Sequence, residues 1–205
     1  RSPGEAAQAL AADLAAAHPG ATVTPRELDL ADKSALEAFC ETLADETYFG
    51  FVHNAGQPYD ALAATMAQDK AEAAMQVNFW SMTRIAKTLL RGMIRSRNGR
   101  IVAIGSVAAL QGNPGNAAYA ASKGALLSYA RTLAIETAKR GITVNVLAPG
   151  FIDTDMMAPY AAYRAGMEKQ IPAGRFAKPG EIAGMAAFLL RVPAAYITVT
   201  TLPVH

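Results

Sequence analysis

The chain alternates stretches with helical periodicity and short apolar runs typical of buried strands. The helical stretches repeat apolar residues every three or four positions, whereas the short runs are rich in β-branched residues. Helices are predicted over residues 4–18, 31–45, 65–96, 118–140 and 179–190, with small helices within 151–175. Extended segments or strands are predicted over residues 21–30, 48–53, 100–105, 142–147 and 196–204.

Turn-forming and capping residues mark the ends of these elements. Pro19-Gly20 ends the first helix, and Gly141 ends the helix over 118–140. Asp32 is a suitable N-cap for the helix over 31–45. We expect a break near Asn78, because an asparagine amide competes for backbone hydrogen bonds inside a helix.

Strands that alternate with helices predict an α/β protein. The expected architecture is a Rossmann-like, doubly wound parallel sheet with helices on both faces. The 205 residues contain no repeat, linker or low-complexity tract, so a single domain is expected over residues 1–205.

Composition and charge narrow the functional class. The formal net charge of +2 argues against a nucleic-acid-binding protein, which would carry a strong basic excess. No apolar run approaches the length of a membrane span, so no membrane association is predicted. Cys40 is the single cysteine, which excludes an internal disulfide framework and favours a packing role for this side chain. We therefore expect a cytoplasmic protein.

The segment Tyr119-Ala-Ala-Ser-Lys123 carries the clearest chemical signal. Four residues apart on a helix, Tyr119 and Lys123 lie on one face. An ammonium beside a phenol lowers the tyrosine pKa, so we expect Tyr119 to transfer a proton at a carbonyl or alcohol oxygen. Ser106 ends a predicted strand thirteen residues upstream, where open α/β sheets bind their ligands.

These residues occur in the order found in a known enzyme family. Asn54-Ala55-Gly56, Asn78, Ser106, Tyr119-x-x-x-Lys123 and Pro149-Gly150 together make the chain resemble the short-chain dehydrogenase/reductases. Within that family, the segments ending at Ser106 and Arg175 and the one starting at Gly141 are most similar to the 3-oxoacyl-(acyl-carrier-protein) reductases.

The resemblance implies a catalytic role for four residues. Tyr119 would be the general acid/base, and Ser106 would hydrogen-bond the substrate oxygen. Lys123 would lower the tyrosine pKa and hold the hydroxyls of the nicotinamide ribose. Asn78 would bend its helix and hold a water that links the lysine to solvent.

The resemblance also implies a dinucleotide cofactor, NADP(H), and no metal. Asp29 would contact the adenine amino group, and Arg1 would pair with a 2′-phosphate. Each residue has a second interpretation that stays open. Asp29 is then a structural acid at a helix N-terminus, and Arg1 is then part of a disordered chain terminus. The implied cofactor contacts are Arg1, Asp29, Leu30, Asn54, Ala55, Gly56, Tyr119, Lys123, Pro149, Gly150, Ile152 and Thr154.

The sequence departs from the family pattern in three places. The glycine-rich turn that binds the cofactor phosphates is missing, and the helix over 4–18 corresponds to the family's second crossover helix. We therefore expect a strand, a helix and a strand to precede the printed sequence. His53 stands where the family usually has a second asparagine, and no chemistry is assigned to it. Val199 follows Thr198 where family members carry glycine.

The expected reaction is the reduction of a 3-oxoacyl thioester on acyl carrier protein. Arg97 and Arg140 would dock that acidic carrier beside the site entrance, and a homo-oligomer, dimer or tetramer, is implied. The methionine- and tyrosine-containing segment over 151–175 is either a substrate-covering lid or core packing. Two alternatives are open: a reductase for another small carbonyl or alcohol, and a non-catalytic partner subunit that binds no cofactor.

Overall fold

A parallel sheet forms the centre of the fold. The computed structural model describes residues 4–205, and within them four strands pair in chain order. Each neighbouring pair is parallel, with Phe51 opposite Ile101 and Ile101 opposite Val144. The strands are β1 (Gly50–His53), β2 (Gly99–Ile104), β3 (Ile142–Pro149) and β4 (Thr201–Val204).

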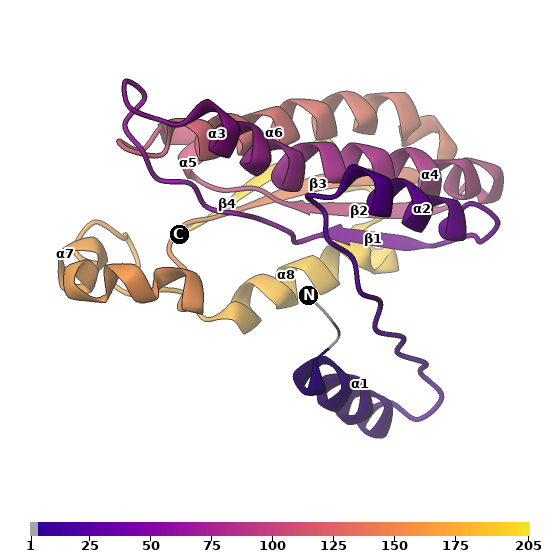
Figure 1. Ribbon diagram of the computed structural model, residues 1–205. Coiled ribbons are helices and arrows are strands. Elements are labelled where there is room, and N and C mark those ends of the chain that lie inside the picture. Colours follow the sequence, from indigo (N-terminus) through magenta and orange to yellow (C-terminus); the bar gives the residue numbers. More distant parts are fainter. Residues whose placement is uncertain (1–3) are drawn as a thin grey trace.

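Helices cover both faces of the sheet, as predicted (Figure 1). One face carries α2 (Lys33–Leu43), α3 (Gln68–Met75), α4 (Ser81–Ser96), α5 (Ala108–Gln111) and α6 (Ala117–Thr137). The other face carries α8 (Pro179–Leu190). Between β3 and α8 lie the 3₁₀ segment η3 (Asp155–Tyr163) and α7 (Arg164–Glu168). The short turns η2 (Ala138–Arg140) and η4 (Val192–Ala194) precede β3 and β4.

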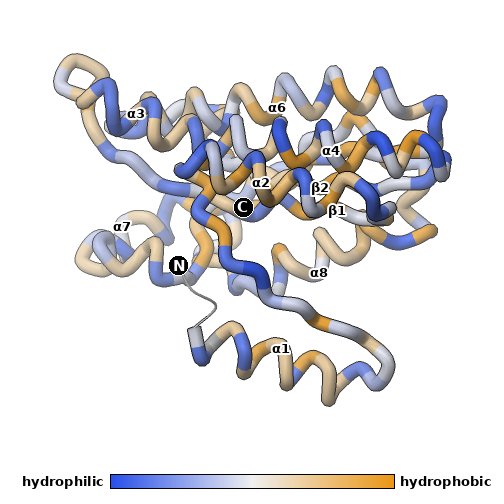
Figure 2. The backbone as a smooth tube through the Cα atoms, turned by 45° about the vertical axis from the view of Figure 1, so that its right-hand side comes forward, coloured by the Kyte–Doolittle hydropathy of each residue, from blue (hydrophilic) through white to orange (hydrophobic). Residues whose placement is uncertain are grey.

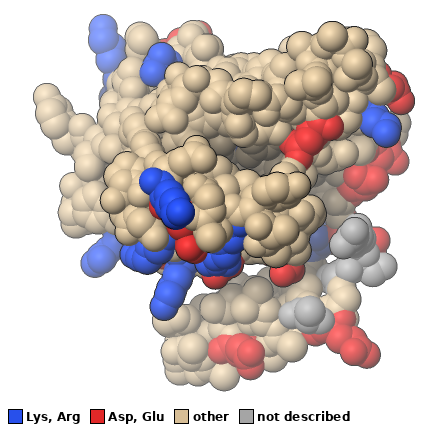
Figure 3. Space-filling view, turned by 90° about the vertical axis from the view of Figure 1, so that its left-hand side faces the viewer, with Lys and Arg blue, Asp and Glu red and all other residues tan. Residues whose placement is uncertain are grey.

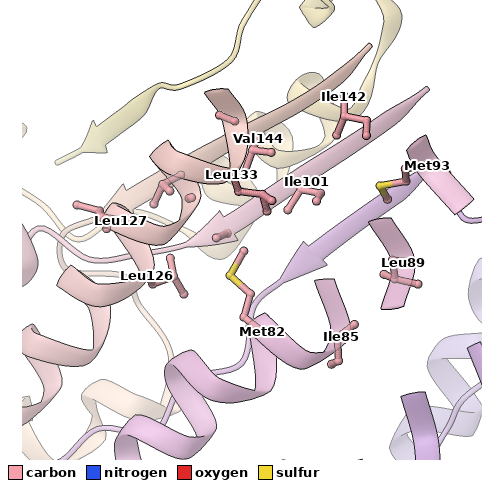
Figure 4. Close-up of a cluster of buried hydrophobic side chains, with 14 of the residues drawn as sticks. Met82, Ile85, Leu89, Met93, Ile101, Leu126, Leu127, Leu133, Ile142 and Val144 are labelled. Carbon is pink, nitrogen blue, oxygen red and sulfur yellow. The ribbon is translucent and has the colours of Figure 1, made fainter. Parts of the chain in front are cut away.

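Each face of the sheet has its own hydrophobic core. On the α4 and α6 side, Met82, Ile101 and Leu126 have no exposed surface and point toward one another (Figure 4). On the α8 side, Val102 and Leu147 pack against Leu189. Because both faces of β2 and β3 are covered, these strands are buried along nearly their whole length instead of alternating between buried and exposed residues.

The expected helix signals are confirmed. The Asp32 carboxylate accepts hydrogen bonds from the backbone N–H groups of Ser34 and Ala35 at 2.9 and 3.0 Å, which caps α2. The break near Asn78 is a π-helical turn, η1 (Gln76–Trp80), between α3 and α4. Such turns lengthen the hydrogen-bonding ring by one residue and bend the helix axis.

The last strand is shorter than predicted. Strand β4 begins at Thr201, although the extended segment was expected from residue 196. Residues before it are held by side chains: the Asn145 amide donates to the Ile197 carbonyl at 2.7 Å, and the Thr198 hydroxyl accepts from the Val144 N–H at 3.0 Å. Val199 has a φ of 63°, in the left-handed region, which interrupts the extended conformation.

One N-terminal expectation needs correction. Helix α1 (Glu5–Ala17) lies away from the sheet rather than across it as a crossover helix would, and the segment over 21–30, expected to be extended, pairs with no described strand (Figure 1). Figure 2 shows hydrophobic and hydrophilic residues mixed along α1, whose Leu10 is 59% exposed. A crossover helix packs on the strands it connects, and within residues 4–205 no strand precedes α1.

Candidate active site

A large cavity lies at the carboxyl ends of β2 and β3, between the sheet, α6 and α8. Its volume is about 640 Å³, which is the size of a small-molecule site. Figure 3 faces this end of the strands and shows a hollow beside the segment that carries α7. Nine predicted site residues line the cavity: Asn54, Gly56, Ser106, Tyr119, Lys123, Pro149, Gly150, Ile152 and Thr154.

Tyr119 and Ser106 both line this cavity. Tyr119 lies near the start of α6, and Ser106 lies two residues after the end of β2. Burial raises the pKa of Tyr119 above its usual value, the hydrogen bond with Ser106 lowers it, and the charge of Asp60 raises it. The net shift is upward, so the phenol is protonated at neutral pH.

The Lys123 ammonium lies over the face of the Tyr119 ring. Its Nζ is 5.9 Å from the ring centroid and donates to the carbonyls of Ile104 at 2.8 Å and Ala55 at 3.5 Å. Burial lowers the pKa of Lys123 to about 8. Burial of the phenol is the largest influence on the Tyr119 pKa, so the net shift is upward even with the Lys123 ammonium nearby, and that ammonium is engaged by backbone carbonyls.

Asn78 lies behind the cavity and has no exposed surface. Its side-chain oxygen accepts from the Gln57 N–H at 2.7 Å. Its side-chain nitrogen donates to the Gln57 carbonyl at 3.1 Å and to the Ser122 hydroxyl at 2.9 Å. The residue thus joins the turn after β1 to α6, directly beside Lys123.

The turn at Asn54–Gly56 forms one side of the cavity. A side chain at position 56 would come within 3.3 Å of the Lys123 Nζ, so glycine leaves room for the lysine. Beyond the turn, the Asp60 carboxylate accepts from the side-chain amide of Asn116, the residue before α6. The Ala61 N–H also donates to the Gly115 carbonyl at 2.7 Å. These contacts hold the loop after β1 against the start of α6.

The opposite side of the cavity follows β3. The Gly150 N–H donates to the Val204 carbonyl at 2.9 Å, and Ile152 forms a bridge with Ala177. The ring of Phe151 stacks on Phe176 at 5.5 Å between centroids. Part of the lid segment over 151–175 therefore has packing contacts, while its Met156 and Met157 line the cavity.

Several predicted residues lie elsewhere. Asp29 and Leu30 do not line the cavity: the Asp29 carboxylate accepts from the Ala31 N–H at 2.9 Å, and the Leu30 carbonyl accepts from Gln76 at 3.1 Å. Ala55 is absent from the lining but offers its carbonyl to Lys123. Arg1 lies outside the described residues.

Arg97 and Arg140 are close together, but they are not beside the cavity. The Arg97 guanidinium donates to the Lys139 carbonyl at 2.9 Å. Each arginine lies two residues before the start of a parallel strand, whereas Ser106 lies two residues after the end of one. They therefore lie at the amino-terminal ends of the strands, whereas Ser106 lies at the carboxyl-terminal ends. The length of β2 separates the two positions by about 20 Å, at about 3.3 Å per residue. The expected position beside the site entrance is wrong within one protomer.

One wall of the cavity was not predicted. It is the face of α8 formed by Pro179, Ile182, Ala183, Ala186, Ala187 and Leu190. Their spacing of three and four residues identifies a helix face, but the sequence alone does not tell which ligand or core such a face meets.

Comparisons with known proteins place this geometry in a family. Residues 2–205 match a family model described as Enoyl-(Acyl carrier protein) reductase. The chain belongs to the short-chain dehydrogenase/reductase family. It is 42% identical over 183 residues to the 3-oxoacyl-(acyl-carrier-protein) reductase FabG of Vibrio cholerae and 43% identical to that of Escherichia coli K12. Both alignments cover 87% of this chain and 74% of the relative.

Membership of this family makes the chain a relative of nicotinamide-dependent oxidoreductases. The FabG protein of Haemophilus influenzae is also similar, at 41% identity over 87% of this chain and 75% of the relative. Among the described helices, none is long and apolar enough to cross a membrane.

Proposed function

We propose that this protein reduces a 3-oxoacyl thioester to the 3-hydroxyacyl thioester, with NADPH as the hydride donor. The observation that carries the proposal is that Ser106, Tyr119 and Lys123 line the same largely apolar cavity. Two hydroxyls that converge on one point can bind a carbonyl oxygen and supply a proton to it. The similarity to FabG proteins supports the 3-oxoacyl thioester as substrate.

Tyr119 acts as the proton donor in this direction. Its raised pKa keeps the phenol protonated at neutral pH, so a proton is available when the substrate oxygen gains negative charge. Ser106 stabilises that charge by a hydrogen bond. Lys123, with a pKa near 8, carries a positive charge in most molecules at neutral pH and favours the resulting phenolate.

The residues around Tyr119 fit the nicotinamide half of a dinucleotide. Backbone at Gly56 and Pro149-Gly150 is open to the cavity, and a side chain at position 56 would approach the Lys123 Nζ. We assign Asn54, Ile152 and Thr154 to the same contact surface. When bound, NADPH supplies the hydride that reduces the carbonyl carbon. The preference for NADPH over NADH rests on Arg1.

The acyl chain occupies the apolar part of the cavity, between Met156, Met157 and the α8 face. Arg97 and Arg140 are proposed as the docking surface for the acidic carrier protein. Because they lie at the ends of the strands opposite Ser106, they bind the carrier protein that delivers substrate to the cavity of a neighbouring copy in a homo-oligomer. Charge reversal at both positions should raise KM for carrier-bound substrate and leave KM for a small thioester unchanged.

The test measures NADPH oxidation with acetoacetyl, crotonyl and aromatic ketone substrates. Turnover of acetoacetyl thioester is expected, with at least a hundredfold loss of kcat in Tyr119→Phe and nearly unchanged NADPH affinity. Tyr59→Phe, which removes a hydroxyl that accepts from the Ala67 N–H at 2.7 Å, is the control. Reduction of crotonyl thioester alone would favour an enoyl reductase. Absence of NADPH binding would support a non-catalytic partner subunit.

A further inference from the structure

His53 is a buried titratable residue that the proposed proton transfer does not use. It ends β1, is 3% exposed, and does not line the cavity. Its Nε2 lies 3.1 Å from the backbone carbonyl oxygen of Asn78. A carbonyl oxygen only accepts hydrogen bonds, so Nε2 carries the proton and Nδ1 does not when the imidazole is neutral.

The carbonyl that His53 contacts belongs to the π-helical turn. In η1 the Ser81 N–H bonds to the Gln76 carbonyl, five residues back, instead of the carbonyl four residues back. Val77, whose carbonyl that N–H would reach in an α-helix, receives the Ser81 hydroxyl at 2.7 Å. Side-chain donors from Ser81 and His53 thus both bind carbonyls of this turn, which favours its altered hydrogen-bond register.

The π-helical turn determines where the Asn78 side chain points. That side chain binds both backbone groups of Gln57 and the hydroxyl of Ser122. Gln57 follows the cavity turn at Asn54–Gly56, and Ser122 precedes Lys123. A change in the register of the turn would therefore displace the contacts that hold the cavity turn against α6.

We propose that His53 is a positioning residue for the active site. Its Nε2–H fixes the π-helical turn, which orients Asn78 and thereby places the 54–57 turn relative to Lys123. This role rests on the proposed reductase function. Burial and the charge of Lys123 lower the pKa of His53 to about 4, so the imidazole is neutral at physiological pH. A protonated His53 would put a second positive charge near the lysine.

A kinetic test compares His53→Gln with His53→Leu. Glutamine places an N–H donor at nearly the reach of the imidazole Nε2, whereas leucine has no donor. We expect His53→Leu to lower kcat tenfold or more with little change in KM, since small displacements of a reacting group are costly. His53→Gln should restore most of the rate. Equal losses in both variants, or full activity in His53→Leu, would overturn the proposal.

Asn145→Leu is the matched control. Asn145 is 1% exposed, and its amide also donates to a backbone carbonyl, that of Ile197 at 2.7 Å. It lies in β3 and does not line the cavity. Losing this bond should lower stability but leave kcat unchanged. If Asn145→Leu slows turnover as much as His53→Leu, a general loss of packing explains the His53 result instead.

A spectroscopic test does not depend on activity. In ¹⁵N-histidine-labelled protein, the His53 imidazole should keep its proton on Nε2 from about pH 5 to about pH 8. Hydrogen exchange at the Gln57 amide should be faster in His53→Leu than in His53→Gln. An Nδ1–H tautomer, or unchanged exchange, would refute the positioning role. If both results hold but the wild-type protein reduces no thioester, the proposed function fails and the role of His53 in the fold stands.

Discussion

Val199 offers a sharp test of the backbone conformation before β4. Its φ of 63° places a β-branched residue in the left-handed region. That conformation costs a non-glycine residue about 1–2 kcal/mol. Glycine avoids this cost but loses about 0.5–1 kcal/mol through the greater freedom of the unfolded chain. Glycine at position 199 should therefore be more stable than alanine by about 0.5–1 kcal/mol.

The comparison of Val199→Gly with Val199→Ala isolates this effect, because both remove the two methyl groups of valine. Val199 is 39% exposed, so the lost burial costs about 1 kcal/mol in each variant. We expect Val199→Ala to lower the free energy of unfolding by about 1 kcal/mol and Val199→Gly to stay near the wild type.

Urea unfolding followed by circular dichroism measures the difference between the two variants. Ala38, exposed in α2, supplies the control, since Ala38→Gly should lose about 1 kcal/mol in a helix interior. Relative to alanine, glycine should thus stabilise the protein at position 199 and destabilise it at position 38. Greater stability of Val199→Ala than of Val199→Gly would refute the left-handed conformation.

Three further predictions follow from the site and its surroundings. Asp60→Asn keeps a side-chain oxygen that accepts from Asn116 but removes a negative charge, so the pKa of Tyr119 should fall. Ultraviolet titration, with Tyr119→Phe as the reference, measures this pKa. An unchanged pKa would contradict the influence of the Asp60 charge on Tyr119. The folded-state pKa of His53 is about 4, below its ordinary value, so the unfolded state binds more protons between about pH 6.5 and 4. The free energy of unfolding should therefore fall as the pH drops through this range. At pH 4 the loss should be about 3 kcal/mol relative to His53→Gln. A pH-independent difference between the two proteins would disprove it. Gly105→Ala places a methyl group 2.9 Å from Val146 and should cost about 1–3 kcal/mol in thermal or urea unfolding, whereas Gly124→Ala in α6 meets no atom within 4 Å and should stabilise.

The local elements were predictable because short-range physics determines them. Asp32 caps α2, Gly141 ends the helical segment before β3 with a φ of 73°, and the apolar runs became buried parallel strands. The break at Asn78 was also visible, since asparagine disfavours a helix interior. The order of motifs placed Ser106, Tyr119 and Lys123 in one site, because parallel strands end at the same edge of a sheet.

Tertiary structure decided what depends on distance and on the surrounding dielectric. Helical spacing placed Lys123 on the same helix face as Tyr119. Only the fold determined that the Lys123 ammonium binds the Ile104 carbonyl and that burial has the largest influence on the pKa of the Tyr119 phenol. The separation of Arg97 from Ser106, by contrast, was already implied by the strand predicted over residues 100–105, which lies between them.

His53 shows the same limit most clearly. In the sequence it is one histidine at the end of a strand, with nothing to mark a function. The contact with Asn78 joins residues 25 positions apart and exists only because η1 exposes a carbonyl to β1. The sequence by itself determined most of the helices and strands, since these depend on neighbouring residues, and its motifs indicated the family to which the chain belongs. The fold determined protonation and positioning, because both depend on groups that meet only after folding.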